Sequence, residues 1–208
     1  MVDESVRLSF RRHLRKEAIR AAHALTLEKG WDRVRVSEVA ALIGVSRPTL
    51  YKEFGDKQGL GDALVLEEAE RFLVGIGATL DDHRDALEEA IPAAVRYTLN
   101  EASSSPLLKS VLTSPGADSR PEETGVLPLL TTSASMLELA SARLVGWIGK
   151  HFPQLDSDDV IDGVDALIRL TISHVVLPTS DSAETGRRIS EVALRYLGLA
   201  SQMSLSRS

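Results

Sequence analysis

The 208-residue sequence contains no cysteine. Disulfide bonds and thiolate metal sites are therefore excluded, which suits a reducing cytoplasm. No run of about 18 apolar residues occurs, so we expect no segment that spans a membrane. The beginning of the chain is rich in arginine and lacks an apolar stretch, so we expect no secretory signal peptide and assign the protein to the cytoplasm.

Motifs that carry enzyme chemistry are also missing. The sequence has no glycine-rich phosphate loop, no His-Glu-x-x-His pair and no strand-flanked nucleophile elbow. Its five histidines show no ligand spacing, and His174 is expected to be a packed or interface residue. The acids at 156–159 suit a helix N-terminus, whose dipole they complement, better than a metal site. We therefore expect no enzyme activity, no cofactor and no metal.

The net charge of −6 argues at first against a nucleic-acid partner, because DNA repels acidic proteins. The distribution of the charges reverses this argument. Residues 1–60 carry twelve Lys and Arg against eight Asp and Glu, a net charge of +4, and the remaining residues carry −10. This asymmetry is typical of a DNA-binding part attached to an acidic body.

Residues 36–54 are predicted to form two short helices joined by a tight turn. Apolar residues of the first helix recur on one face, which we expect to point inward. Ser37 can cap this helix by accepting a hydrogen bond from a free backbone N–H, and Gly44 tolerates the positive φ at which the helix must end. The pattern predicts a helix-turn-helix.

The second helix of this pair has a capping residue and an outward polar face. Ser46 can cap it, and Pro48 lies in its first turn, where a missing N–H costs nothing. Leu50 and Phe54 are four residues apart and are expected to be buried. Arginine and lysine suit guanine edges and phosphates, a threonine methyl suits the thymine methyl, and a tyrosine hydroxyl suits a phosphate oxygen. The outward residues are Arg47, Thr49, Tyr51 and Lys52. The alternative is a solvated helical hairpin with ordinary surface charges.

The segment Gly44-Val-Ser-Arg-Pro-Thr-Leu-Tyr-Lys-Glu-Phe-Gly-Asp-Lys-Gln-Gly-Leu60 closely resembles the DNA-binding signature of the TetR family of bacterial transcriptional repressors. The resemblance begins near residue 18 and covers the first quarter to third of the chain. Two features depart from the family pattern: Glu53 is acidic on the recognition helix, and Gly59 and Gly61 replace better helix formers. The resemblance implies phosphate contacts for Tyr51 and Lys57. It also implies a small-molecule pocket among the middle helices.

Basic residues also flank the helix-turn-helix. Lys57 follows the capping residue Asp56 and stands at a helix N-terminus, where the helix dipole favours a phosphate. Residues 1–8 are expected to be a loose arm before a helix over 9–29. The basic cluster at 11–16 can track phosphates beside the reading helix; the alternative is a solvated basic helix face.

The rest of the chain reads as a series of helices, from Lys57 to Ile76 and beyond and over about 83–103, 107–112, 127–152 and 156–177, with a last one after Asp181. Pro92 predicts a kink or a late start in the second of these helices. A polar segment rich in Pro, Gly and Ser, residues 113–125, predicts a mobile loop.

The last two helices are apolar on adjoining faces. A homodimer built as a four-helix bundle from these helices would cover them; folding back on the chain's own core is the alternative. Candidate residues for the pocket come from the middle helices, and each of them could instead be ordinary core. They are Phe72, Ile76, Tyr97, Met136, Arg143, Trp147 and Phe152. Arg143, if it faces inward, would favour an anionic ligand.

The sequence thus predicts an all-α protein, with a helix-turn-helix DNA-binding domain over 1–56 and a helical effector-binding and dimerisation domain over 57–208. We interpret it as a transcriptional repressor that binds a palindromic operator in double-stranded DNA as a dimer and is released by a small molecule. The predicted DNA contacts are Ser37, Ser46, Arg47, Pro48, Thr49, Tyr51, Lys52 and Lys57. The alternatives are a helical enzyme or ligand-binding module with an inert helix-turn-helix, and a protein-interaction adaptor.

Overall fold

The computed structural model describes residues 2–113, 132–178 and 181–196, and the side chains of 5–109, 137–178 and 181–196. Every regular element in these ranges is helical, which confirms the predicted all-α class. Within them, no helix has the length and apolar character needed to cross a bilayer. The elements are α1 (Val2–Lys29), the 3-10 helix η1 (Trp31–Arg33), α2 (Val36–Leu42), α3 (Arg47–Phe54), α4 (Lys57–Asp81), α5 (Leu87–Ser104), α6 (Pro106–Thr113), α7 (Thr132–His151), α8 (Ser157–Val176) and α9 (Ser182–Tyr196).

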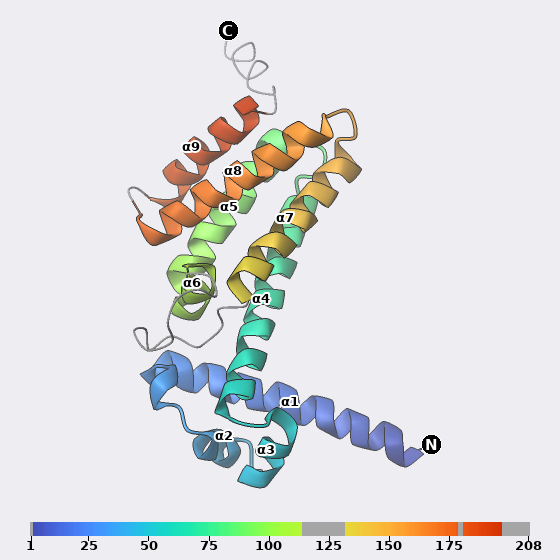
Figure 1. The fold of residues 1–208 in the computed structure, drawn as a ribbon, viewed down its shortest axis with the longest axis vertical. Coiled ribbons are helices and arrows are strands. Elements are labelled where there is room, and N and C mark those ends of the chain that lie inside the picture. The colour runs from blue at the N-terminus through green and yellow to red at the C-terminus, as the bar shows by residue number, and fades with distance from the viewer. Residues whose placement is uncertain (1, 114–131, 179–180, 197–208) are drawn as a thin grey trace.

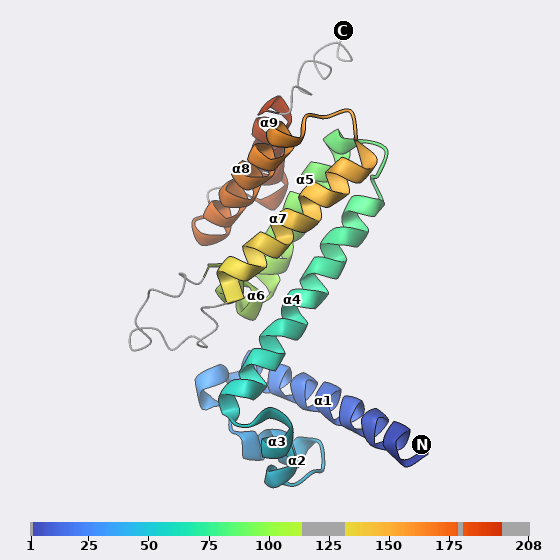
Figure 2. The same ribbon diagram turned by 45° about the vertical axis from the view of Figure 1, so that its right-hand side comes forward.

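The helices form two groups that α4 connects (Figures 1 and 2). We call α1, η1, α2 and α3 the head, and α5 to α9 the body. In the body, α5 packs against α4, α6, α8 and α9, and α7 packs against α8. In the head, α1 packs against α2, α3 and the first part of α4. The head therefore reaches the body through a helix that belongs to both.

The apolar spacing of α1 explains the core of the head. Leu14, Ala18, Ala22 and Leu25 recur every three or four residues and are all buried. Leu50 of α3 is buried with them. Gly30 then ends α1 with φ of 80°, in the left-handed region that glycine adopts without strain. A small three-helix core thus fixes the helix-turn-helix against α1.

The N-terminal segment differs from the expectation of a loose arm, because α1 begins at Val2. Residues 2–13 contain neither Gly nor Pro, so nothing in them interrupts a helix that grows from the packed part of α1. Residues 5–13 are all exposed. This stretch is therefore a solvated helical projection of the head (Figure 1).

The body helices follow the sequence pattern closely. α5 starts at Leu87 and retains Pro92 inside it, which agrees with the predicted late start. The Asp156 carboxylate accepts hydrogen bonds from the backbone N–H groups of Asp158 and Asp159, at 2.9 and 3.2 Å, so Asp156 caps α8 and the other two acids lie in its first turn. The predicted mobile loop lies almost entirely outside the described residues. The division at residues 56 and 57 stays a prediction.

A buried carboxylate lies where α4 passes from the head to the body. The Glu68 side chain is only 4% exposed. Arg71 donates to its two oxygens at 2.9 and 3.1 Å, and the Ser105 hydroxyl donates at 2.8 Å. His23 of α1 approaches to 3.9 Å, and Arg71 also donates to Glu101 of α5 at 3.1 Å. One carboxylate therefore connects α1, α4, α5 and the residue that precedes α6.

The partners of Glu68 determine its ionisation. Burial alone would raise the pKa of Glu68, but the hydrogen bonds from Arg71 and Ser105 outweigh it and hold the pKa below its ordinary value of 4.5. The carboxylate is therefore ionised at neutral pH, and its contribution to stability depends on these two donors.

Gly59, which departs from the family pattern, is required by a close approach of the backbone. A methyl group at this position would overlap the carbonyl oxygen of Phe54, the last residue of α3. The Gly59 N–H also donates to the capping carboxylate of Asp56 at 2.8 Å. The turn between α3 and α4 is thus too tight for a side chain.

We predict that Gly59→Ala lowers the free energy of unfolding by about 1–3 kcal/mol, because the backbone must shift to relieve the overlap. Gly77→Ala is the matched control on the same helix, where a methyl group meets nothing within 4 Å. It should raise stability by about 0.5–1 kcal/mol, since alanine favours a helix. Urea unfolding of both variants decides, and equal effects would contradict the steric explanation.

We also predict a pH dependence that originates at Glu68. Because its pKa is lowered in the folded protein, its contribution is fully present above pH 4.5 and is lost as the pH falls below that value. Glu68→Gln should be less stable than the wild type at pH 7, and its stability should fall less steeply below pH 4.5, by up to about 1.4 kcal/mol per pH unit. Thermal unfolding across pH measures this, with the exposed neighbour change Glu67→Gln as control. Parallel curves for Glu68→Gln and wild type would contradict it.

Candidate functional site

The turn between α2 and α3 has the geometry that its residues predict. Gly44 has φ of 70° and Gly55, after α3, has φ of 81°. The Ser46 hydroxyl accepts a hydrogen bond from the Thr49 N–H at 3.3 Å and caps α3, with Pro48 in the first turn. Leu50 is only 1% exposed and anchors α3 in the head core. The helix is therefore held in one rotation about its axis.

That rotation leaves one stripe of α3 in solvent. Its members lie at helical positions one and four residues apart, and all of them are exposed: Arg47, Pro48, Tyr51 and Lys52. Thr49 differs from the expectation of an outward residue, since it is half-buried and its hydroxyl lies 2.8 Å from that of Ser46. The cap interaction turns Thr49 toward the start of its own helix.

Ser37 does not cap α2, contrary to the sequence interpretation. The helix begins one residue earlier, at Val36, which is buried, so Arg35 takes the capping position. The Glu38 carboxylate accepts the Arg35 N–H at 3.0 Å and supplies the partner that Ser37 was expected to provide. Ser37 lies half-buried in the first turn, and its DNA contact stays a prediction.

The acidic residue of α3 points away from the exposed stripe. Glu53 is only 8% exposed and accepts hydrogen bonds from Arg11, at 2.6 Å, and Arg15, at 3.4 Å. The Arg15 guanidinium also lies 5.2 Å from the centre of the Phe54 ring. Two arginines of the basic cluster, for which the sequence left phosphate contacts and a solvated helix face open, thus pair with α3 and connect it to α1. The acid consequently does not oppose an anion at the stripe.

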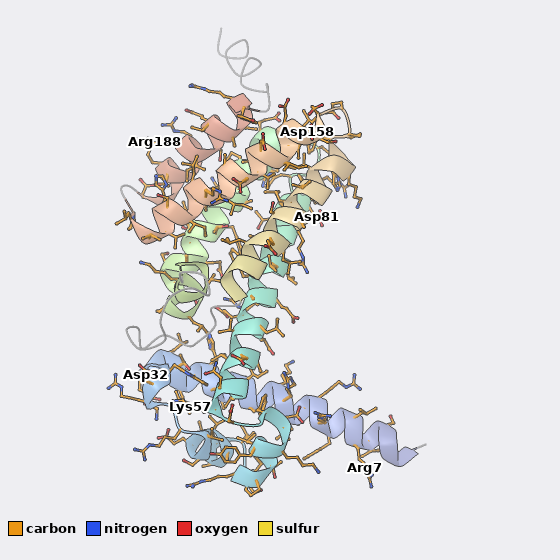
Figure 3. All side chains as sticks on the ribbon, in the orientation of Figure 1. Arg7, Asp32, Lys57, Asp81, Asp158 and Arg188 are labelled. Atoms are coloured by element: carbon orange, nitrogen blue, oxygen red, sulfur yellow. The ribbon has the colours of Figure 1, made fainter. Side chains whose placement is uncertain are left out.

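Lys57 also has an internal partner. Its ammonium group donates to the backbone carbonyl of Asp32 at 3.0 Å and lies 5.2 Å from the centre of the Trp31 ring. Figure 3 shows Lys57 beside Asp32 where α4 meets the head. The contact ties the start of α4 to η1. The predicted phosphate contact of Lys57 stays a prediction.

A cavity of about 240 Å³ lies among α4, α5, α7 and α8. Four of the seven candidate pocket residues line it: Phe72, Ile76, Arg143 and Trp147. The other three differ. Tyr97 and Phe152 do not line the cavity; the centres of their rings lie 5.9 Å from those of the lining residues Phe72 and Trp147, respectively. The Met136 side chain lies outside the described side chains.

The cavity is apolar inside and polar at its rim. The hydroxyls of Thr98 and Thr171, which the sequence reasoning missed, line it but donate to carbonyls of their own helices at 2.9 and 2.7 Å. The Trp147 indole N–H donates to Asp81 at 2.8 Å. Arg143 is exposed at the edge. Since most lining residues come from the inward faces of amphipathic helices, only that periodicity could have indicated them.

Among the described residues, no three His, Asp or Glu side chains come close enough together to hold a metal ion. The charged clusters of this part of the chain are instead ion pairs, such as that of Glu53 with Arg11. The arrangement therefore offers an exposed basic and aromatic helix at one end of the molecule and an apolar cavity in the body.

Comparisons with known proteins agree with this arrangement. The family described as "Bacterial regulatory proteins, tetR family" matches residues 18–64, and "Bacterial Tetracyclin repressor, C-terminal domain" matches residues 85–195. The HTH-type transcriptional regulator AlkX of Mycobacterium tuberculosis is 31% identical over 188 residues, covering 88% of this chain and 86% of that protein. The HTH-type transcriptional repressor BdcR of Escherichia coli is 36% identical over 94 residues, covering 43% and 48%.

Solved structures show the same relationship. The TetR family repressor AlkX from Dietzia sp. has a TM-score of 0.64 and 27% identity, covering 88% of this chain and 96% of that one. FadR from Bacillus halodurans, described as a fatty acid degradation regulator, has a TM-score of 0.57 at 21% identity, covering 87% and 94%, and shows the shared fold. The helix α3 is exposed, both family regions match, and a relative matches 88% of the chain. The chain therefore belongs to the TetR family of DNA-binding transcriptional regulators.

Proposed function

We propose that the protein is a repressor that inserts α3 into the major groove of a palindromic operator. The observation that carries this proposal is the exposed stripe of Arg47, Tyr51 and Lys52, on a helix whose Ser46 cap and buried Leu50 fix its orientation. Arginine can read a guanine edge, and the tyrosine hydroxyl and the lysine can bind phosphates. Ser37, Thr49 and Lys57 would then be secondary contacts.

A homodimer would present two such helices. Some apolar residues of α8 and α9 are covered by the chain's own core, among them Val164 and Ile189, so folding back accounts for one face of each helix. The outer faces still expose large apolar side chains: Ile161, Val176, Leu177, Val192 and Tyr196. The Tyr196 hydroxyl donates to Asp162 at 3.1 Å, so the exposed residues of the two helices adjoin. Pairing these faces would relate the heads by a two-fold axis, as a palindrome requires.

The central cavity suggests the kind of effector. Its inner wall is built from apolar side chains, and Arg143 is the charged lining residue at the rim. A ligand with an apolar chain and an anionic end would place its chain against the apolar wall and pair its charge with Arg143. The Dietzia relative is described as implicated in biodegradation of n-alkanes, which supports an aliphatic ligand. Such a ligand would release DNA by preferring a head arrangement that does not fit the operator.

The protein would act in the cytoplasm, where its DNA partner lies. The alternative of a ligand-binding module or enzyme with an inert helix-turn-helix predicts no DNA binding. A salt titration separates the two, because binding that neutralises phosphates weakens steeply as salt rises.

The first test is selection of bound fragments from the source genome by the purified full chain. The wild type should enrich one palindrome and Arg47→Ala/Tyr51→Ala should not. We use these exposed residues rather than Lys57, whose bond to Asp32 would also be lost. If the wild type enriches no sequence under conditions in which it is folded, the repressor proposal is wrong.

The two basic residues of α3 should differ in how their removal affects DNA binding. Arg47→Ala is expected to weaken binding to the palindrome by about 1–3 kcal/mol with little loss on random DNA, because it reads a base edge. Lys52→Ala should weaken both alike and reduce the salt slope by about 1, because it contacts phosphate. Anisotropy titrations measure both. Equal losses for Arg47→Ala on the two DNAs would rule out base reading.

Trp147 is a direct probe of the cavity, because its side chain lines the cavity and the chain has only two tryptophans. In Trp31→Phe, the fluorescence of Trp147 should change on addition of dodecanoate or dodecanol. Arg143→Ala in the same background should weaken dodecanoate by about fivefold, the value of an exposed ion pair, and leave dodecanol unchanged. If neither dodecanoate nor dodecanol changes the Trp147 fluorescence, the proposal of an aliphatic effector is wrong. If Arg143→Ala weakens the binding of both equally, the role of Arg143 is wrong.

A further inference from the structure

The orientation of the head depends on how α4 is held. α4 packs against α1 at its beginning and against α5 and α6 further along, and it runs continuously from head to body (Figure 2). Leu64 and Val65 are buried toward its beginning, and Phe72 and Leu73 lie two turns later at the cavity. Glu68 lies between these two pairs. It therefore occupies the point about which head and body could turn relative to each other.

The contacts of Glu68 reach every segment that meets at this point. Ser105 donates to it at 2.8 Å while its hydroxyl accepts the Leu108 N–H at 3.1 Å, so the same group caps α6. Arg71 joins Glu68 to Glu101 of α5, and His23 of α1 stands 3.9 Å away. Because these bonds are short and directional, few relative positions of the segments preserve all of them.

Leaving this geometry has a high cost. A buried carboxylate that loses one of its donors keeps its charge without the compensating hydrogen bond, which is strongly unfavourable. Apolar contacts such as those between α1 and α4 are less directional and tolerate small rotations. The carboxylate is therefore better suited than the apolar core to select one angle.

We propose that Glu68 is a positioning residue that fixes the angle between head and body, and thereby sets the spacing between operator half-sites that the dimer accepts. The statement about the angle stands on the structure alone, and the statement about spacing rests on the proposed function. Nothing in the sequence pattern indicated this residue, because its partners are up to 45 residues away in the chain.

The cluster also adjoins the cavity. Arg71 precedes the lining residue Phe72, and Glu101 follows the lining residue Thr98 by one helical turn. A ligand that separates α4 from α5 would therefore pull Arg71 away from Glu101. The same contacts that fix the angle are placed to change with occupancy of the cavity.

The angle can be measured without DNA, because the chain has no native cysteine to interfere with labelling. Nitroxides on Ala41→Cys, exposed in the head, and Glu88→Cys, exposed in the body, report one head-to-body distance by pulsed electron paramagnetic resonance. Mixing with unlabelled protein removes distances between subunits. The otherwise wild-type chain should give one narrow distribution, and Glu68→Gln should broaden it about twofold or shift it, since a buried ion pair is broken.

Two further variants make the result decisive. Glu67→Gln removes the same charge from the exposed neighbouring position and should leave the distribution unchanged. Ser105→Ala keeps every charge and removes one donor, so it should broaden the distribution even if Glu68→Gln does not fold. Unchanged distributions in the folded Ser105→Ala and Glu68→Gln proteins would overturn the proposal, as would equal broadening by Glu67→Gln.

The consequence for DNA is tested on palindromes whose half-sites are separated by different numbers of base pairs. The wild type should prefer one spacing. In Glu68→Gln and Ser105→Ala, the ratio of affinities between this spacing and the others should fall about tenfold. Binding to a single half-site should be unchanged, because neither substitution alters α3. A retained preference would overturn the link to spacing. If the wild type binds no palindrome at any spacing, the proposed function fails, and the distance measurement still decides the role of Glu68.

Discussion

The structure depends on one continuous helix that contributes buried residues to both the head and the body. The first turns of α4 cover α1 in the head, and its later turns form a wall of the central cavity. Neither end can move without the other, because helix backbone bonds do not allow an internal hinge at low cost. Glu68, placed where α4 passes from head to body, adds a polar constraint, because Arg71 of α4 and Ser105 beside α6 both donate to its carboxylate.

The head shows how local and distant contacts together define a reading helix. The Ser46 cap and the left-handed Gly44 determine where α3 begins. Its rotation is set by contacts from elsewhere, namely Leu50 in the core and Glu53 bound to Arg11. Since side chains one helical turn apart share a face, burying these two leaves the opposite stripe exposed. The exposed chemistry of α3 is therefore decided by the residues that are not exposed.

The contrast between local and long-range contacts explains how much of the structure could be predicted from the sequence. Helical periodicity and glycine turns are local, so the all-α class and the helix-turn-helix were predictable. Pairings over long separations are not local, and for this reason the inward direction of Glu53 and the bond of Lys57 to Asp32 were missed. The Ser37 cap failed because Val36 is buried and begins the helix earlier. The resemblance to the TetR family implied a pocket among the middle helices, and four of the seven candidate residues line the cavity, while Thr98 carried no signal beyond its helix face.

The pairing of Glu53 with Arg11 and Arg15 has a further consequence for how the protein would search DNA. Cations already bound to a carboxylate release fewer counterions from a polyanion, so the affinity for arbitrary sequences is lower than the arginine content suggests. The specific DNA contacts that we propose for the exposed stripe would keep their full value. Under the proposed function, such a regulator would dissociate sooner from each wrong site, and occupancy of its own site would depend more on recognition than on charge.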